Sequence, residues 1–119
     1  MRILSLKKMK NSFKAAFQGL KAAYSEQTFQ ILCFCGFVVI VLMFILGLSF
    51  LEKIIILFLV TSVLTFELIN SQIEKILDFL QPNHDPKVKV IKDISAGAVL
   101  LVSFGAAVIG FLIFSPYFK

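Results

Sequence analysis

Three carboxylates and one amide recur at helical spacing in one short segment of the chain. An α-helix has about 3.6 residues per turn, so Glu67, Asn70, Glu74 and Asp78 fall on one face, opposite a stripe of isoleucine and leucine. Carboxylates stacked in this way repel one another unless a cation lies among them. The pattern favours Mg²⁺ held by one or two carboxylates together with the phosphates of a substrate.

Glu67 differs from the other acids because it lies inside an apolar run. An ionisable group at membrane depth is costly, so it is expected to face the interior of a helix bundle and to have a function. A carboxylate at that depth could accept a proton from a lipid hydroxyl. The same residues could instead line a path for an ion or a proton, or serve assembly alone. The residues therefore leave lipid-headgroup chemistry, transport and a structural role open.

The composition places these residues in an integral membrane protein. Hydrophobic residues make up 59% of the 119-residue chain, which is more than an ordinary soluble domain contains. Most of the lysines stand beside apolar segments, so the net charge of +5 is better explained by anionic lipid headgroups than by nucleic acid. The length suits one domain, residues 1–119.

Three apolar stretches are long enough to cross the hydrocarbon core as helices. A short turn that contains Glu52 and Lys53 separates the first two, and Pro82 and Pro86 end the second helix ahead of a polar loop over residues 87–92. Basic residues and apolar residues at intervals of three and four predict an amphipathic helix on the membrane surface over residues 1–26. The predicted fold is all-α, with this surface helix and helices over residues 29–51, 54–80 and 94–114.

The distribution of positive charge predicts the orientation. The N-terminal segment, which begins with Arg2, and the segment 75–92 hold ten of the twelve basic residues, whereas the end of the chain has only Lys119. The positive-inside rule then places the N-terminus and the second loop in the cytoplasm and the C-terminus outside. The acidic face of the second span would lie at the cytoplasmic side.

The order of these polar residues resembles that of the prokaryotic diacylglycerol kinase and undecaprenol kinase family. The shared pattern is Glu67-x-x-Asn70-x-x-x-Glu74-x-x-x-Asp78, followed by Lys92-Asp93 and Ala96-Gly97-Ala98-Val99. The resemblance covers nearly the whole chain. It implies a homotrimer in a bacterial plasma membrane, with active sites between subunits, that uses ATP and Mg²⁺ to phosphorylate a lipid alcohol.

The resemblance also implies roles for individual residues. Glu67 would be the general base on the lipid hydroxyl, and Glu26 and Glu74 would bind Mg²⁺ and ATP. Asn70, Lys92 and Asp93 would contact the nucleotide, and Ala96 would contact the lipid.

The lipid is indicated only by analogy. The segment Ser95-Ala96-Gly97-Ala98 and Pro86 are more similar to the undecaprenol kinase branch than to the diacylglycerol kinase branch. Diacylglycerol kinase is the alternative, and a non-enzymatic transport or scaffold protein is the second alternative. The second loop reads Asn83-His84-Asp85-Pro86, with its histidine one place from the family's usual position, and no role is assigned to it. Asp78 could equally be a helix-end charge near Lys75 or the loop lysines.

Overall fold

The computed structural model describes residues 5–118, and every regular element in that range is helical. Arg2 and Lys119, which entered the prediction of orientation, lie outside the described residues. The elements are α1 (Leu6–Ala23), α2 (Gln27–Ile45), α3 (Phe50–Leu80), α4 (Pro86–Phe114) and a final 3₁₀ turn, η1 (Ser115–Phe118).

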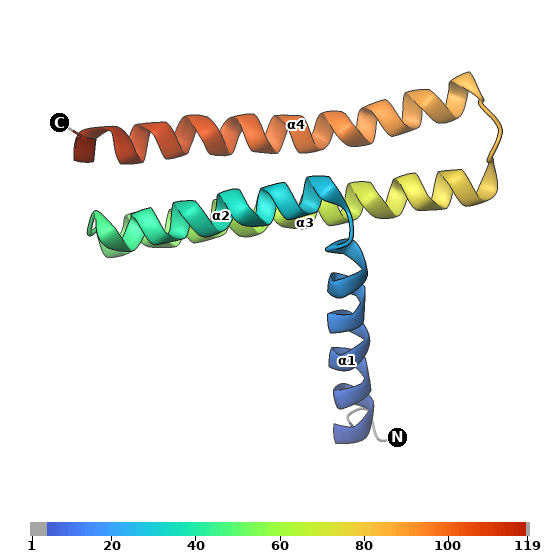
Figure 1. Cartoon of the computed structure of the whole chain (residues 1–119), viewed down its shortest axis with the longest axis horizontal. Coiled ribbons are helices and arrows are strands. Elements are labelled where there is room, and N and C mark those ends of the chain that lie inside the picture. The colour runs from blue at the N-terminus through green and yellow to red at the C-terminus, as the bar shows by residue number, and fades with distance from the viewer. Residues whose placement is uncertain (1–4, 119) are drawn as a thin grey trace.

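Three of the helices run alongside one another and the first leaves them crosswise. Figure 1 shows α2 beside the first half of α3, while the second half of α3 continues beyond α2 to the turn that leads into α4. By length and composition, α2, α3 and α4 are each able to cross a membrane. Helix α1, which exposes both its apolar and its basic side chains, has the direction expected of a helix lying along the membrane surface.

The turn between α2 and α3 differs from the prediction. Helix α2 ends at Ile45 and not at 51, because Gly47 adopts a left-handed conformation with φ of 68°. Helix α3 begins at Phe50 and not at 54, because Ser49 and Glu52 form a capping box. The Ser49 backbone N–H donates to the Glu52 carboxylate at 2.9 Å. Glu52 is therefore a residue of the first turn of α3 and not of a solvated loop.

Helix α4 also begins earlier than predicted, at Pro86 and not at 94. Asp85 caps it, since its carboxylate accepts a hydrogen bond from the Lys87 backbone N–H at 2.8 Å. Pro86 has the backbone angle that suits the first helical position and needs no hydrogen-bond partner there. The predicted polar loop over residues 87–92 is thus the first part of a helix, which gives Lys89, Lys92 and Asp93 helical geometry.

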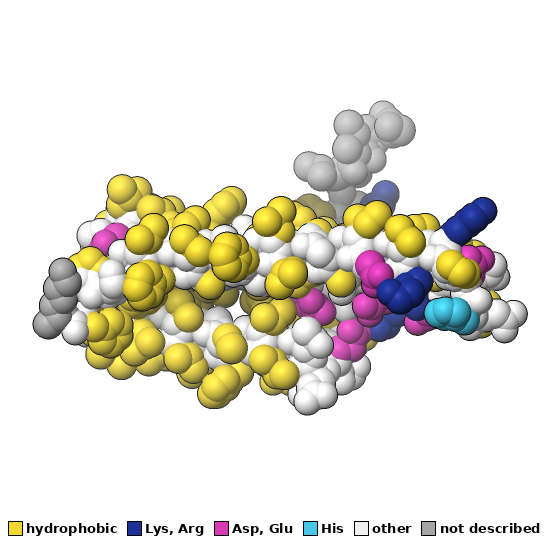
Figure 2. Space-filling view, turned by 90° about the horizontal axis from the view of Figure 1, so that it is seen from above, with side chains coloured by type: hydrophobic (Ala, Val, Ile, Leu, Met, Phe, Trp, Pro, Cys, Tyr) yellow, Lys and Arg dark blue, Asp and Glu magenta, His cyan; other side chains and the backbone are white. Residues whose placement is uncertain are grey.

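The buried core is small and lies at the α2–α3 turn. Met43, Leu48 and Ile56 form it, and apolar residues near the end of α4 pack against them. Farther along, α2 and α3 approach so closely that a Cβ on Gly36 would lie 2.9 Å from Val60 Cγ1. Helix α4 has no buried residue. Most of the molecule therefore presents hydrophobic side chains outward, as Figure 2 shows, in keeping with contact to lipid or to other subunits.

Candidate active site

Charged side chains gather on the part of the bundle that extends from the start of α2 to the turn between α3 and α4 (Figure 2). We call this region the charged end; it holds Glu26, Glu74, Asp78, Lys75 and Lys92. Here the acidic face of α3 is turned inward. The exposed fraction is 5% for Glu67, 8% for Asn70 and 6% for Ser71. The part of the polar face that holds Glu67 and Asn70 is thus buried, whereas Glu74 is half-buried and Asp78 is exposed.

Glu26 links the start of α2 to this face. It is the N-cap residue of α2, and its side chain makes no capping hydrogen bond to that helix. One carboxylate oxygen accepts a hydrogen bond from the Ser71 hydroxyl at 2.7 Å, and the other pairs with the Lys75 ammonium group. The Lys75 and Ser71 contacts hold the pKa of the Glu26 carboxyl below its usual range. Glu26 is therefore an ionised group at physiological pH.

Glu67 is close enough to two other carboxylates for their charges to act on it. The charges of Glu74 and Glu26 both repel that of Glu67. Glu74 is half-buried on the turn of α3 that follows Asn70 and Ser71. Between these acids, the side-chain oxygen of Asn70 is buried and has no hydrogen-bond partner. The group formed by Glu26, Glu67 and Glu74 combines excess negative charge with an unused acceptor.

Helix α4 contributes a cation to the charged end. Lys92 forms an ion pair with Asp78 and so bridges α4 and α3. Asp93 instead pairs with Lys89, at 2.7 Å and one turn away on the same helix, with both side chains exposed. Of the two residues expected to contact nucleotide from this helix, only Lys92 is tied to α3 by a described ion pair. Asp78 has the lysine partner that a helix-end charge would have.

Other residues singled out in the sequence lie on the surface or have structural contacts. Ala96 is exposed on α4. In the turn before α4, Asn83 and His84 are exposed, whereas Asp85 is the cap of α4 and also accepts a hydrogen bond from Gln81 at 3.3 Å. The sequence reasoning did not select Ser71 or Lys75. Their spacing of four residues, on a helix with buried acids, is the signal that could have found them.

The donor set suits a divalent ion that is shared with phosphate. Within residues 5–118, no three Asp, Glu, His or Cys side chains converge on one metal position. The arrangement therefore does not resemble a closed protein cage. Two carboxylates, Glu26 and Glu74, with the free oxygen of Asn70 nearby, match the way Mg²⁺ is bound when a substrate supplies the remaining oxygens.

An apolar groove of about 600 Å³ lies between α2, α3 and α4. Its lining includes Leu32, Leu64 and Ser103 toward the charged end and Phe114 and Phe118 at the opposite end. Leu64 precedes Glu67 by less than one helical turn. None of the lining side chains is charged. The groove is therefore apolar along its length and large enough for part of a hydrocarbon chain.

These features define a small helical membrane protein in which an acidic site meets an apolar groove. Comparison with known proteins gives the class a name. The family model described as prokaryotic diacylglycerol kinase matches residues 14–114. The chain belongs to the prokaryotic diacylglycerol kinase family, and it is a lipid kinase. The prediction of the family and of an all-helical membrane fold is confirmed, and the predicted alternative of a non-enzymatic protein is set aside.

The relatives are named for two activities, undecaprenol kinase and diacylglycerol kinase. An undecaprenol kinase of Bacillus subtilis is 35% identical over 106 residues, which cover 88% of this chain and 86% of that protein. A diacylglycerol kinase of Synechocystis is 30% identical over 107 residues, or 88% of this chain and 61% of that protein. A diacylglycerol kinase of Haemophilus influenzae is 39% identical over 69 residues, or 57% and 58% of the two chains.

Proposed function

We propose that this protein is an undecaprenol kinase, which transfers the γ-phosphate of ATP to the hydroxyl of a membrane polyprenol. The observation that carries the proposal is the position of Glu67, a buried carboxylate less than one helical turn beyond Leu64, which lines the apolar groove. The Bacillus relative supports this lipid, because the alignment spans most of both chains. Diacylglycerol is the alternative acceptor, favoured by the two relatives that are named diacylglycerol kinases.

The groove favours the polyprenol on chemical grounds. A polyprenol presents only hydrocarbon behind its hydroxyl, whereas diacylglycerol also brings two ester groups that need polar partners. The lining of the groove offers a single hydroxyl, that of Ser103, and no charged group. The polyprenol hydroxyl would then lie at Glu67, with its chain running along α2, α3 and α4. Ala96 would contact the lipid from the α4 side.

The reaction assigned to Glu67 is proton removal. The lipid oxygen forms a bond to the γ-phosphorus, the bond from that phosphorus to the β,γ-bridging oxygen breaks, and ADP leaves. The proton of the lipid hydroxyl passes to the Glu67 carboxylate. Most of the catalysis in phosphoryl transfer comes from positioning and from electrostatic stabilisation. The burial of Glu67 fixes the carboxylate and keeps water from competing with the lipid hydroxyl.

The remaining residues of the charged end would bind the nucleotide. Glu26 and Glu74 would hold Mg²⁺, which offsets phosphate charge when it is bound. Asn70, whose oxygen has no partner, would complete the polar contacts on α3. On α4, Lys92 would exchange Asp78 for phosphate as a point cation, and Asp93 would contact the nucleotide after separating from Lys89.

The assembly and orientation follow the same proposal. A homotrimer in a bacterial plasma membrane would cover part of the exposed apolar surface of α4, which buries no residue within one chain. The charged end, and with it the N-terminus, would face the cytoplasm, where ATP is found. Native mass spectrometry of the protein released from a mild detergent tests the assembly: a trimer is expected, and a monomer over the whole concentration range would contradict it.

Phosphoryl transfer to purified lipids tests the proposed acceptor. The protein in detergent is given labelled ATP and Mg²⁺ with either undecaprenol or diacylglycerol, and kcat/KM is measured for each lipid. We expect a higher kcat/KM for undecaprenol. A higher value for diacylglycerol would establish the alternative, and label in neither lipid would refute both.

A further inference from the structure

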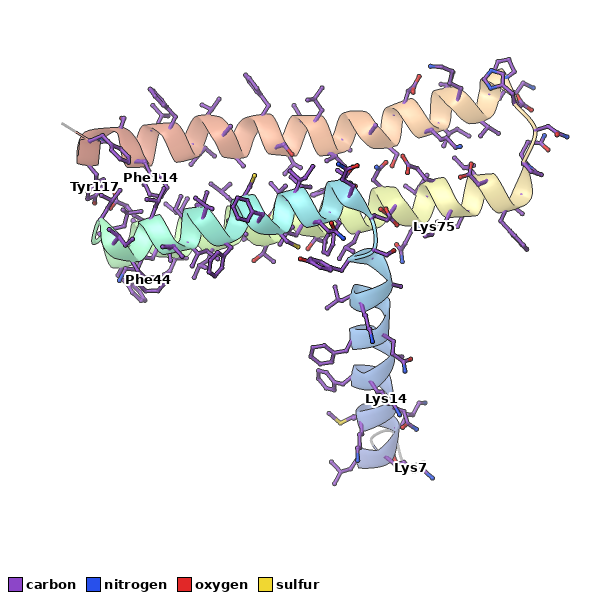
Figure 3. The ribbon with its side chains drawn as sticks, in the orientation of Figure 1. Lys7, Lys14, Phe44, Lys75, Phe114 and Tyr117 are labelled. Carbon is purple, nitrogen blue, oxygen red and sulfur yellow. The ribbon has the colours of Figure 1, made fainter. Side chains whose placement is uncertain are left out.

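Lys75 has no role in the proposed phosphoryl transfer, although its side chain contacts the proposed metal site. Its ammonium group is paired with Glu26, one of the two carboxylates proposed to hold the metal ion. In sequence it stands directly after Glu74, the other one. The Lys75 side chain is 69% exposed, whereas that of Glu26 is 26% exposed. The lysine therefore reaches the carboxylate from the solvent side. Figure 3 labels Lys75 on α3, beside the start of α2.

Both carboxylate oxygens of Glu26 already have a partner. One oxygen accepts the Ser71 hydrogen bond and the other faces Lys75. The Ser71 contact can persist beside a metal ion, because a carboxylate oxygen has two lone pairs and accepts more than one partner. A lysine ammonium group and a divalent cation cannot share the second oxygen without strong repulsion. Binding of a metal ion through the second oxygen of Glu26, or through both oxygens, thus requires Lys75 to move.

The surroundings of Lys75 give it freedom to move. The pair is solvent-exposed on the lysine side, and such pairs are weak, so thermal motion breaks them readily. A lysine has a flexible four-carbon side chain that carries its charge over several ångströms. Once released, its ammonium group remains on the same turn of α3 as Glu74, on the solvent-exposed side of that turn.

We propose that Lys75 is a tethered cation that neutralises Glu26 in the nucleotide-free protein and transfers to the nucleotide phosphates when metal and ATP bind. This inference rests on the proposed function. The exchange keeps the site close to charge balance in both states. Without ligand, Lys75 offsets one of the crowded carboxylates. With ligand, the metal ion takes over that task and Lys75 offsets the excess negative charge of the nucleotide. Lys75 would therefore oppose metal binding alone and favour binding of metal together with ATP.

This role predicts two effects of opposite sign for one substitution. Lys75→Met removes the competing cation, so Mn²⁺ alone should bind the nucleotide-free protein about fivefold more tightly, the factor that corresponds to an exposed ion pair. The same substitution removes a charged contact to phosphate, so KM for MgATP should rise about tenfold. Lys75→Arg keeps the charge and should resemble the wild type in Mn²⁺ binding. A lysine that only stabilises the α2–α3 contact would not produce opposite effects.

Electron paramagnetic resonance of free Mn²⁺ measures the first effect without nucleotide, lipid or turnover. Lys87→Met is the matched control, because it removes the same charge near the start of α4, where only the backbone of Lys87 contacts Asp85. We expect Mn²⁺ to bind Lys75→Met about fivefold more tightly than the wild type, and Lys87→Met like the wild type. Glu26→Gln removes the carboxylate. In that background, Mn²⁺ should bind equally tightly whether position 75 is lysine or methionine.

Unchanged or weaker Mn²⁺ binding in Lys75→Met would overturn the inference, as would an equal gain in Lys87→Met. A thermal unfolding temperature close to that of the wild type shows that each variant is folded when Mn²⁺ binding is compared. The result is separable from the proposed function. If the wild type phosphorylated no lipid but Lys75→Met bound Mn²⁺ more tightly, the proposed acceptor would fail and the ion exchange at Glu26 would stand.

Discussion

Glu67→Gln separates a catalytic role of this side chain from a structural one. The substitution keeps the size and shape of a side chain that is 5% exposed. It removes a charge that Glu74 and Glu26 repel. Replacing an uncompensated buried charge by a neutral group of the same volume is neutral or stabilising. We therefore expect the variant to fold, with a thermal unfolding temperature equal to or above that of the wild type.

The same substitution should nearly abolish turnover. A general base contributes about 10²–10⁴-fold to rate. The kcat for lipid phosphorylation should thus fall by about two orders of magnitude or more. Binding of MgATP should persist, because Glu26 and Glu74 remain. Measuring thermal unfolding, nucleotide binding and lipid phosphorylation on one preparation gives all three values for the same protein.

Glu52→Gln is the matched control for Glu67→Gln. It makes the same chemical change on the same helix, at the end remote from the charged end. Glu52 serves the capping box of α3 and accepts a hydrogen bond from the Tyr117 hydroxyl, and glutamine is also accepted at this position of a capping box. Turnover should therefore stay near the wild-type value. A folded Glu67→Gln protein that phosphorylated lipid within about threefold of the wild type would refute the role of Glu67, because general-base loss costs far more.

Three further predictions concern the metal ion, helix packing and orientation. Glu74→Gln should raise the Mg²⁺ concentration that gives half-maximal rate by at least roughly tenfold, the lower bound for loss of a supporting group at a metal site; an unchanged Mg²⁺ titration would remove Glu74 from the site. Gly36→Ala should lower the unfolding free energy by about 1–3 kcal/mol, because the added Cβ has no room. Gly110→Ala should leave the unfolding free energy unchanged, because its Cβ would meet nothing within 4 Å. Equal unfolding temperatures for the two variants would contradict the close packing of α2 against α3 at Gly36. Single cysteines at Lys10 and Ser115, in a chain without Cys33 and Cys35, should react with an impermeant reagent from opposite sides of the membrane, and labelling of both from one side would contradict three crossings.

The sequence predicted the helices well where hydrophobicity alone decides. Three apolar stretches, each long enough to cross a membrane, correspond to α2, α3 and α4. The boundaries were less accurate, because they depend on a few local contacts. Ser49 and Glu52 extend α3 toward its N-terminus, and Asp85 with Pro86 extends α4 through lysines whose polarity had indicated a loop. Capping can extend a helix through polar residues that a hydropathy profile assigns to a loop.

The polar face of α3 was also predictable, since helical spacing alone places Glu67, Asn70 and Glu74 together. Contacts between helices were not. The pairing of Glu26 with Ser71 and Lys75 joins residues far apart in the chain, and it depends on how the start of α2 meets the middle of α3. The same holds for the pair between Lys92 and Asp78. A single sequence contains no information on such distances until the helices have been placed side by side.

Competition between the two lipids in one bilayer is the most direct test of the proposed acceptor. Vesicles that contain the protein, undecaprenol and diacylglycerol at equal concentrations receive limiting MgATP, and the phosphorylated lipids are identified by mass spectrometry. Both lipids then meet the same population of sites at the same membrane depth, so only their fit to the groove and to Glu67 distinguishes them. We expect undecaprenyl phosphate to be the main product. Phosphatidic acid as the main product, formed while undecaprenol stays unmodified, would contradict the proposed acceptor.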